Sequence, residues 1–368
     1  MTEPVLPAYG SRSLCELLSS VGDGLAVPGC RDVLGLGARD RVAVVIIDGL
    51  GLAQLRECAE SAPFLAERTA ASLTSVFPST TCAALGSIGT GLTPGRHGLV
   101  GASFVYPETG RLLNPLGWGS GPSPIAVQPE PTVLERAEAA GVSIAVVSDR
   151  SYRHSGLTVA ALRGGQYKGA DGPGERVATV IESLDVPGRG LVIGYWGSLD
   201  RTAHVHGVAS PHYRFELSHV DLLVRQIAAS LPAGARLIVT ADHGMIDCPE
   251  VIDLDADPGF GEHVRLVAGE PRMRHVYARR GAAAAVARRW QDLLADKAQV
   301  LLGEEAVAEG WFGDVDPGNI ERIGSVLAIA GPGIRLGMPS RDSVVSSLLG
   351  QHGGLTEAEM VVPLAMID

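Results

Sequence analysis

Short runs of aliphatic residues alternate along the chain with segments in which apolar residues recur at helical spacing. The runs are apolar at successive positions, which is typical of strands buried on both faces of a parallel sheet. They occupy 41–47, 71–77, 142–147, 191–196, 236–240 and 361–366, and helical spacing occurs at 13–20, 53–60, 63–68, 79–90, 132–140, 177–184 and 213–230. This alternation predicts an α/β fold with a mostly parallel central sheet and helices on both faces.

The pattern changes at about residue 258. A hairpin-like pair of runs is followed by a helical segment and then by two more short strands, at 264–268, 273–278, 282–294, 300–302 and 326–329. We interpret 258–325 as a small α+β insertion, or cap, in a core built from 41–257 and 326–368. Residues 1–40 are expected to form an N-terminal arm with one short helix, and 102–130 an irregular surface cover.

The composition of the chain argues against some classes of binding partner. The net charge of −11 argues against a nucleic-acid polymer or an anionic membrane as partner. The sequence has five cysteines without paired spacing, no secretory signal and no apolar run of membrane-spanning length. We therefore expect a cytoplasmic protein with reduced thiols and a small soluble substrate.

Three of the apolar runs end in the same way, with metal-binding residue types. Asp48 follows the first run, Asp200 and His204 follow the run at 191–196, and Asp242 and His243 follow the run at 236–240. The carboxyl ends of parallel strands meet at one edge of a sheet, where ligands bind. These side chains are therefore expected to converge there, joined by His352 from a glycine-rich loop.

A candidate nucleophile lies between the first two blocks. Ser79, Thr80 and Thr81 begin a segment of small residues at helical spacing, and the N-terminus of a helix attracts anions. Asp and His donors suit Zn²⁺ or Mn²⁺, and two such ions can bind the attacking and leaving oxygens of a displacement at phosphorus. Thr81 is the hydroxyl that we expect to attack.

Each residue taken alone also has a structural explanation. Asp48 suits a strand-end turn, Asp200 and His204 suit an i,i+4 pair on a helix, and Thr81 suits a helix cap. We interpret His97, in a Pro-Gly-Arg-His-Gly loop, as a residue that braces the loop. The repeated order of strand and then ligand is what favours a metal site.

The motifs resemble those of the alkaline phosphatase superfamily, in particular its nucleotide pyrophosphatase/phosphodiesterase branch. They follow the family's order and extend from about residue 41 over most of the chain. They are Ile-Ile-Asp48-Gly-Leu, Val76-Phe-Pro-Ser-Thr-Thr81, Thr90-Gly-Leu-Thr-Pro-Gly-Arg-His97-Gly-Leu-Val-Gly101, Leu199-Asp200-x-x-x-His204-x-x-Gly207, Ala241-Asp242-His243-Gly244-Met and His352-Gly-Gly.

The resemblance implies a fold like that of alkaline phosphatase and a role for each matched residue. Two divalent ions, Zn²⁺ or Mn²⁺, would be held, one by Asp48, Thr81, Asp242 and His243 and the other by Asp200, His204 and His352. Thr81 would attack phosphorus and form a phosphothreonine, which water then hydrolyses.

Two positions depart from the family pattern. The family's phosphate-binding Asn aligns with Ala102, where Ser103 substitutes only in part, and the base-stacking aromatic residue after the nucleophile is Cys82. Nucleotide specificity therefore does not carry over. Substrate contacts are expected from 102–130, from 151–168 and from the insertion, with Ser103, Arg153 and Lys168 as candidates.

The function expected from these features is hydrolysis of a phosphodiester or pyrophosphate bond. A phosphomonoesterase or a phosphonoacetate-hydrolase-like enzyme with the same metal ligands is the alternative, and a non-catalytic, metal-stabilised binding domain is a third hypothesis. A dinucleotide-binding fingerprint fails because Gln54 stands where its third glycine belongs. The sulfatase modification signature fails because its Pro and Arg are absent after Cys82.

Overall fold

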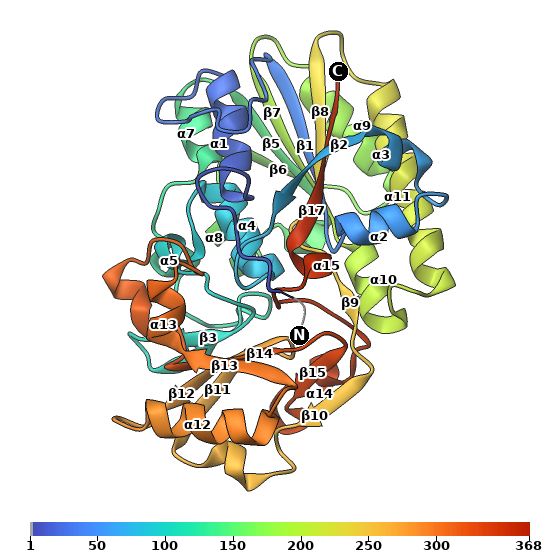
Figure 1. Cartoon of the computed structure of the whole chain (residues 1–368). Coiled ribbons are helices and arrows are strands. Elements are labelled where there is room, and N and C mark those ends of the chain that lie inside the picture. Colours follow the sequence, from blue (N-terminus) through green and yellow to red (C-terminus); the bar gives the residue numbers. More distant parts are fainter. Residues whose placement is uncertain (1–2) are drawn as a thin grey trace.

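A seven-stranded sheet organises the larger part of the computed structural model, which describes residues 3–368 (Figure 1). Its strands, in spatial order, are β2 (Thr69–Thr74), β17 (Val361–Ile367), β8 (Ala235–Thr240), β1 (Arg41–Ile47), β7 (Gly190–Trp196), β5 (Ser143–Ser148) and β6 (Gln166–Gly169). The run from β8 to β6 is parallel, and β17 is antiparallel to both β8 and β2. The predicted α/β fold with a mostly parallel sheet is confirmed.

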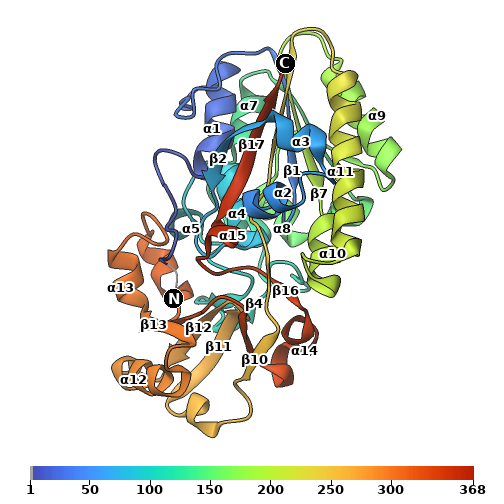
Figure 2. The same cartoon turned by 45° about the vertical axis from the view of Figure 1, so that its right-hand side comes forward.

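Helices cover both faces of this sheet (Figures 1 and 2). One face carries α1 (Cys15–Gly24), α4 (Thr81–Thr90), α7 (Val133–Ala139) and α8 (Gly156–Ala161), and the other carries α3 (Pro63–Arg68), α9 (Pro173–Leu184) and α11 (Pro211–Ala229). Six of the seven residues of β1 are buried because helices pack on both sides of it. Within residues 3–368, no helix is long and apolar enough to cross a membrane.

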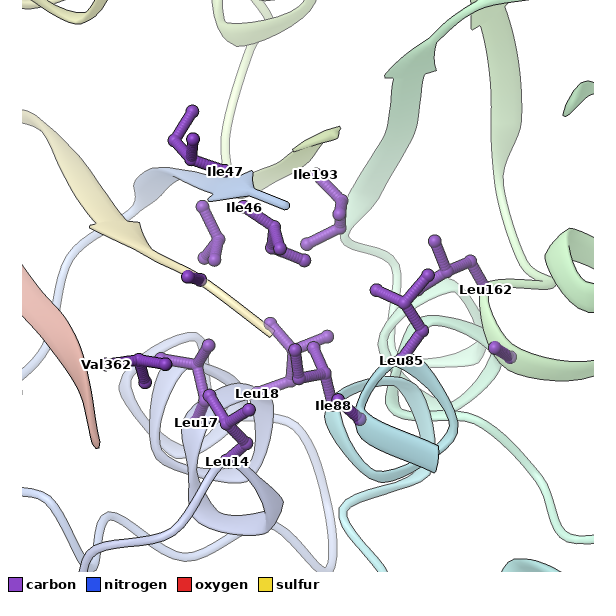
Figure 3. Close-up of a cluster of buried hydrophobic side chains, with 14 of the residues drawn as sticks. Leu14, Leu17, Leu18, Ile46, Ile47, Leu85, Ile88, Leu162, Ile193 and Val362 are labelled. Atoms are coloured by element: carbon purple, nitrogen blue, oxygen red, sulfur yellow. The ribbon is translucent and has the colours of Figure 1, made fainter. Parts of the chain in front are cut away.

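The N-terminal segment belongs to the hydrophobic core. Figure 3 shows Leu14, Leu17 and Leu18, at the start of α1, beside Ile88 of α4, and all four side chains are fully buried. The expected arm is therefore anchored along its helix; its residues 1–2 lie outside the described part of the chain. The remaining core helices are short: α2 (Leu52–Glu57), α5 (Pro94–His97), α6 (Pro124–Val127), α10 (Ser198–His206) and α15 (Glu357–Met360).

The smaller part of the molecule is built on a second, antiparallel sheet. Its strands, in order, are β11 (Val264–Glu270), β12 (Met273–Ala278), β14 (Val326–Ala330) and β13 (Ala298–Leu302), and α12 (Ala283–Leu294) packs on it. A separate apolar cluster around the fully buried Trp290 lies between helix and sheet. The expected hairpin at 264–278 is present.

The limit expected at residue 325 cuts through this smaller sheet, because β14 pairs with both β12 and β13. Two further strands, β10 (Glu250–Asp253) and β15 (Ile334–Gly337), pair with each other, and α14 (Pro339–Ser347) contacts β15. We therefore propose that the cap spans about 250–347. All five residues of β14 are apolar, as in a strand of the central sheet. The sequence pattern alone therefore could not assign β14 to the smaller sheet.

Short elements occur in the stretch that was expected to be irregular and in a second stretch that was expected to contact substrate. Residues 102–130 include the hairpin of β3 (Phe104–Tyr106) and β4 (Arg111–Leu113). Residues 151–168 include α8 and most of β6, which closes the sheet at one edge. β6 reads Gln-Tyr-Lys-Gly and is half-exposed, so it lacks the apolar run that marks a buried strand.

Two buried histidines outside the sheet edge accept a backbone hydrogen bond at Nδ1. His97 accepts from Leu99 N–H at 3.1 Å and its Nε2 contacts Ser87 Oγ at 2.9 Å, which bears out its bracing role. His275 accepts from Gly324 N–H at 3.1 Å and donates from Nε2 to Val100 O at 3.0 Å. Burial lowers the pKa of His97 to about 3 and that of His275 to about 4.

These histidines are expected to make the fold acid-sensitive. Each pKa is lower in the folded chain than in the unfolded chain, so their stabilisation is complete above the unfolded pKa and is lost as the pH falls toward the folded value. Between pH 7.5 and pH 5 each should cost roughly 2 kcal/mol of unfolding free energy. Urea titrations at both pH values measure the loss, and His275→Gln should remove about half of it. An unchanged pH slope in that variant would contradict the assignment.

Candidate active site

The predicted ligands meet at the carboxyl edge of the central sheet. Asp48 directly follows β1, Asp242 and His243 follow the neighbouring strand β8, and Asp200 lies in the first turn of α10, just after β7 on the other side. The strands β8, β1 and β7 are parallel neighbours, so their ends lie side by side.

The side chains form two groups, each of which could hold a metal ion. Atoms of Asp48, Asp242 and His243 lie within 4.8 Å of one another, and so do atoms of Asp200, His243 and His352. His243 Nε2 is 3.4 Å from Asp48 Oδ1 and 3.6 Å from Asp242 Oδ2. Asp200 Oδ1 is 3.4 Å from His204 Nε2 and 3.8 Å from His352 Nε2. His243 thus stands between the two groups.

Backbone carbonyl groups hold all three histidines in the same way, through the Nδ1 atom. The Nδ1 atoms of His204, His243 and His352 contact the carbonyl oxygens of Gly350, Gly244 and Ser79 at 2.7, 3.0 and 3.0 Å, respectively. A carbonyl only accepts, so each Nδ1 carries a proton and donates it, and Nε2 is the ring nitrogen that faces the site. Backbone support of this kind orients imidazoles that bind metals.

The carboxylates of the site lack protein partners where the imidazoles face them. The buried atoms Asp48 Oδ1, Asp200 Oδ1 and Asp242 Oδ2 have no hydrogen-bond donor within residues 3–368. Burial, followed by the charges of Asp200 and Asp242, holds the pKa of Asp48 well above its usual range. Burial also lowers the pKa of His352 well below the ordinary histidine value. Divalent cations satisfy such a set, because they compensate the carboxylates and accept the imidazole lone pairs.

Thr81 lies at the N-terminus of α4, beside these groups. Its Oγ1 is 3.1 Å from His243 Nε2, and the preceding Thr80 caps the helix by accepting from Ala83 N–H at 3.4 Å. The next residue, Cys82, is fully buried, and burial holds the pKa of its thiol well above the usual range. The structure therefore gives no support to Cys82 as a nucleophile.

Tyr195 is a site residue that the sequence analysis missed. Its hydroxyl donates to Asp48 Oδ2, which leaves Oδ1 of the same carboxylate facing the site. Tyr195 is near the end of β7, where an aromatic residue is ordinary strand composition. Only the pairing of β7 with β1 reveals that its side chain reaches Asp48.

A cavity of about 450 Å³ opens beside Thr81 and the ligands. It is lined by Asp48, Thr81, Leu85, Leu116, Val146, Ser148, Tyr152, Ser155, Leu157, Thr158, Leu162, Tyr167, Tyr195, Gly197, Asp200, Arg201, His204, Val205, Leu348 and His352. Its size is ordinary for a small-molecule site. The stretch 151–168, where specificity was expected, supplies one of its sides.

The three predicted substrate contacts lie outside this lining. Ser103 Oγ donates to Gly269 O in the cap at 3.0 Å, and Arg153 Nη2 donates to Tyr167 O at 3.0 Å. Lys168 is half-buried on β6. The cation that does line the cavity is Arg201, one residue after Asp200 on α10, where the exposed face of the helix gave no signal in the sequence.

A buried ion pair ties the cap to the loop that carries His352. Arg272, at the tip of the β11–β12 hairpin, donates to both carboxylate oxygens of Glu359 at 3.0 and 2.9 Å, and both side chains are fully buried. Glu359 also accepts from Gly354 N–H at 2.8 Å. The guanidinium and this backbone bond hold the pKa of Glu359 below its usual value despite the burial.

Replacing Arg272 by methionine should lower the unfolding free energy by about 3–5 kcal/mol, because it leaves the Glu359 carboxylate buried without its counter-charge. Chemical denaturation measures this change. Glu359→Gln combined with Arg272→Met should recover part of the loss, since neither charge then remains. Equal losses in the single and double variants would show that the pair does not act as a unit.

The chain matches a known protein family over most of its length. The family model described as type I phosphodiesterase/nucleotide pyrophosphatase matches residues 42–355. No curated protein matches the chain.

Solved structures resemble the fold at low sequence identity. The human ectonucleotide pyrophosphatase/phosphodiesterase 5 has a TM-score of 0.69 at 20% identity, covering 89% of this chain and 87% of that one. Its murine counterpart has a TM-score of 0.66 at 21% identity, with 88% and 87% covered, and an inactive variant of it was solved with AMP. Phosphonoacetate hydrolase from Sinorhizobium meliloti, in complex with phosphonoformate, has a TM-score of 0.68 at 22% identity, covering 89% and 90%.

Proposed function

Because the chain belongs to the type I phosphodiesterase/nucleotide pyrophosphatase family, a family of hydrolytic enzymes, we propose that it is a two-metal phosphohydrolase. Its expected substrate is a small molecule with a phosphodiester or pyrophosphate bond. The observation that carries the proposal is the cluster at the sheet edge, where unpartnered carboxylate oxygens and oriented imidazole nitrogens face one another. A purely structural role would leave these buried polar atoms unsatisfied.

The proposed ligand sets are those that the family resemblance implies, and they match the two groups of side chains except that His204 takes the place of His243 beside Asp200 and His352. Asp48, Thr81, Asp242 and His243 would hold one divalent ion, and Asp200, His204 and His352 would hold the other. The donor set of carboxylates and imidazoles suits Zn²⁺ and also Mn²⁺. When bound, such ions neutralise the negative charge that develops on the phosphoryl oxygens.

In the proposed reaction, the Thr81 hydroxyl releases its proton to solvent and its oxygen forms a bond to phosphorus, while the bond from phosphorus to the leaving oxygen breaks in line with it. The leaving oxygen takes the bonding electrons, and the phosphoryl group stays on Thr81 until water hydrolyses it. Because α4 begins at Thr81, its backbone N–H groups and the positive end of its dipole would lie beside this phosphoryl group. The hydrogen bond from the Tyr195 hydroxyl would hold the Asp48 carboxylate in the same orientation during both steps of the reaction.

A second class of reaction would use the same metal-binding residues. A phosphonoacetate-hydrolase-like or phosphomonoesterase activity is favoured by Ala102 and Cys82, since both departures remove contacts that nucleotide-cleaving relatives use. The fold likeness to phosphonoacetate hydrolase is as close as that to the nucleotide pyrophosphatases.

Turnover of a substrate panel by metal-loaded protein separates the two classes. Bis(p-nitrophenyl) phosphate, p-nitrophenyl phosphate and phosphonoacetate represent the diester, monoester and phosphonate reactions. We expect the diester to have the highest kcat/KM and chelation to abolish its turnover. A preference for phosphonoacetate would assign the second class, and undiminished turnover after chelation would refute the two-metal mechanism.

A further inference from the structure

Resting on the proposed function, we infer that the cavity beside Thr81 selects substrates with an uncharged apolar or aromatic group on phosphorus, in preference to a nucleoside. The group concerned is the ester group that stays on phosphorus when Thr81 attacks. The inference comes from three features of the cavity: its inner end, its tyrosine wall and its mouth.

The inner end of the cavity is aliphatic. Leu85, Val146, Leu157 and Leu162 line it, and each is at most 7% exposed. Leu85 lies one helical turn after Thr81 on α4, so both side chains project from the same face of that helix. Figure 3 shows Leu85 and Leu162 close to each other. A group on phosphorus that points along α4 therefore meets hydrocarbon.

This placement also decides which substrate group enters the cavity. In an in-line displacement the leaving oxygen departs on the side of phosphorus opposite Thr81 Oγ1. Leu85, which lines the cavity, follows Thr81 on the same face of α4, so we take a group that contacts Leu85 to be the group that stays on phosphorus.

The wall of the cavity carries three tyrosine rings whose polar ends are largely engaged. Tyr195 donates its hydroxyl to Asp48 and Tyr167 donates to Asp149 O, so two phenols are used by the protein itself. The rings of Tyr152 and Tyr195 meet edge to face with centroids 6.3 Å apart. Aromatic rings in this setting offer stacking and apolar contact, and they give little hydrogen bonding to a ligand.

A nucleoside would find few matching groups on these walls. Ser148 Oγ donates to Tyr195 O at 3.4 Å and Ser155 Oγ donates to Thr158 Oγ1 at 2.9 Å. Beyond the predicted metal ligands, the lining residues include no Asn, Gln, Asp or Glu that could read the edge of a base or a ribose hydroxyl. A buried polar ligand edge without partners costs binding free energy.

The mouth of the cavity is apolar as well. Leu116 is 62% exposed and Val205 56% exposed, and both line the cavity. Exposed apolar residues that cluster around an opening usually mark a binding surface. Arg201 lies among them and forms no ion pair with any residue in 3–368, which leaves its charge available to an anionic substrate during entry.

The test compares p-nitrophenyl phosphodiesters that differ only in the retained group: methyl, phenyl or thymidine 5′-yl. With metal-loaded wild-type protein, kcat/KM for the phenyl ester should exceed that for the methyl ester by about 10-fold or more, and should exceed that for the thymidine ester. Leu157→Ala should lower the phenyl-to-methyl ratio at least about threefold, because it removes side-chain contacts that only the larger group makes.

Leu134→Ala is the matched control. Leu134 is also a buried leucine, on α7, and lies outside the cavity lining, so its truncation should leave the ratio unchanged. A ratio near one in the wild-type protein, a preference for the thymidine ester, or equal ratios in Leu157→Ala and wild type would overturn the inference while the proposed function stands.

Binding gives a readout that does not depend on turnover. Calorimetric titration of metal-loaded protein should give a Kd for phenylphosphonate at least about fivefold below that for methylphosphonate. Equal affinities would overturn the inference. If no ester is hydrolysed and phenylphosphonate still binds more tightly, the proposed reaction fails and the apolar selectivity of the cavity stands.

Discussion

Thr81→Ala is expected to lower kcat on a phosphodiester by about 10³-fold or more, because it removes the oxygen that forms the bond to phosphorus. The Oγ1 atom lies within 3.1 Å of His243 Nε2, at the start of α4 and at the edge of the substrate cavity. Thr81→Ser retains the hydroxyl and should recover most of the activity. Single-turnover kinetics on metal-loaded protein measure the chemical step directly.

Thr80→Ala is the matched control for this experiment. Thr80 is equally a buried threonine, and its Oγ1 caps α4 by accepting from Ala83 N–H. Its loss should cost about 1 kcal/mol of unfolding free energy and leave the chemistry largely intact. If Thr80→Ala abolished turnover and Thr81→Ala did not, the assignment of the nucleophile would be wrong by one residue.

Asp48→Asn is expected to remove one of two bound metal ions and to lower kcat/KM by at least about 100-fold. Elemental analysis should give two ions per wild-type chain and about one per variant chain. The same substitution should shrink the rise in Tm that metal gives over chelated protein, because bound ions stabilise the native state. In chelated protein, Asp48→Asn should be as stable as wild type or more so, since it removes a buried carboxylate that lies close to two others.

Asp221→Asn separates a metal effect from the loss of a buried carboxylate. Asp221 is 7% exposed and caps α3 by accepting from Leu65 N–H at 2.7 Å, away from the site. It should lower stability in loaded and chelated protein alike and leave two ions bound. Full metal content and activity in Asp48→Asn would refute the proposed ligand set.

The sequence was most informative where one strong local pattern determines a structure. An uninterrupted apolar run that ends in a carboxylate has few stable placements other than a buried strand with its polar end at the sheet edge. Asp48, Asp200 and Asp242 could therefore be placed at that edge, and parallel pairing brings them together. The helix that begins at Thr81 was equally readable, because hydroxyl residues precede small apolar ones at helical spacing.

The parts that could not be predicted depend on contacts between distant segments. Tyr195 reaches Asp48 only because β7 pairs with β1, and Arg201 lines the cavity only because α10 presents it there. β14 carries the same apolar pattern as a strand of the main sheet, so its place in the smaller sheet follows from its partners β12 and β13. β6 was missed because an edge strand needs no apolar run.

The order of strands in the central sheet also determines when the active site can form during synthesis. Strand β2, immediately upstream of the Thr81 segment, joins the sheet through β17, and Ser75 is held by Met360 O and by Asp242 O. A ribosome must therefore make residues 361–367 before β2 can pair and Thr81 can be fixed opposite His243. Until then β8 offers an open, apolar edge on which other chains can pair. Activity should accordingly appear only after β17 has paired with β8 and β2.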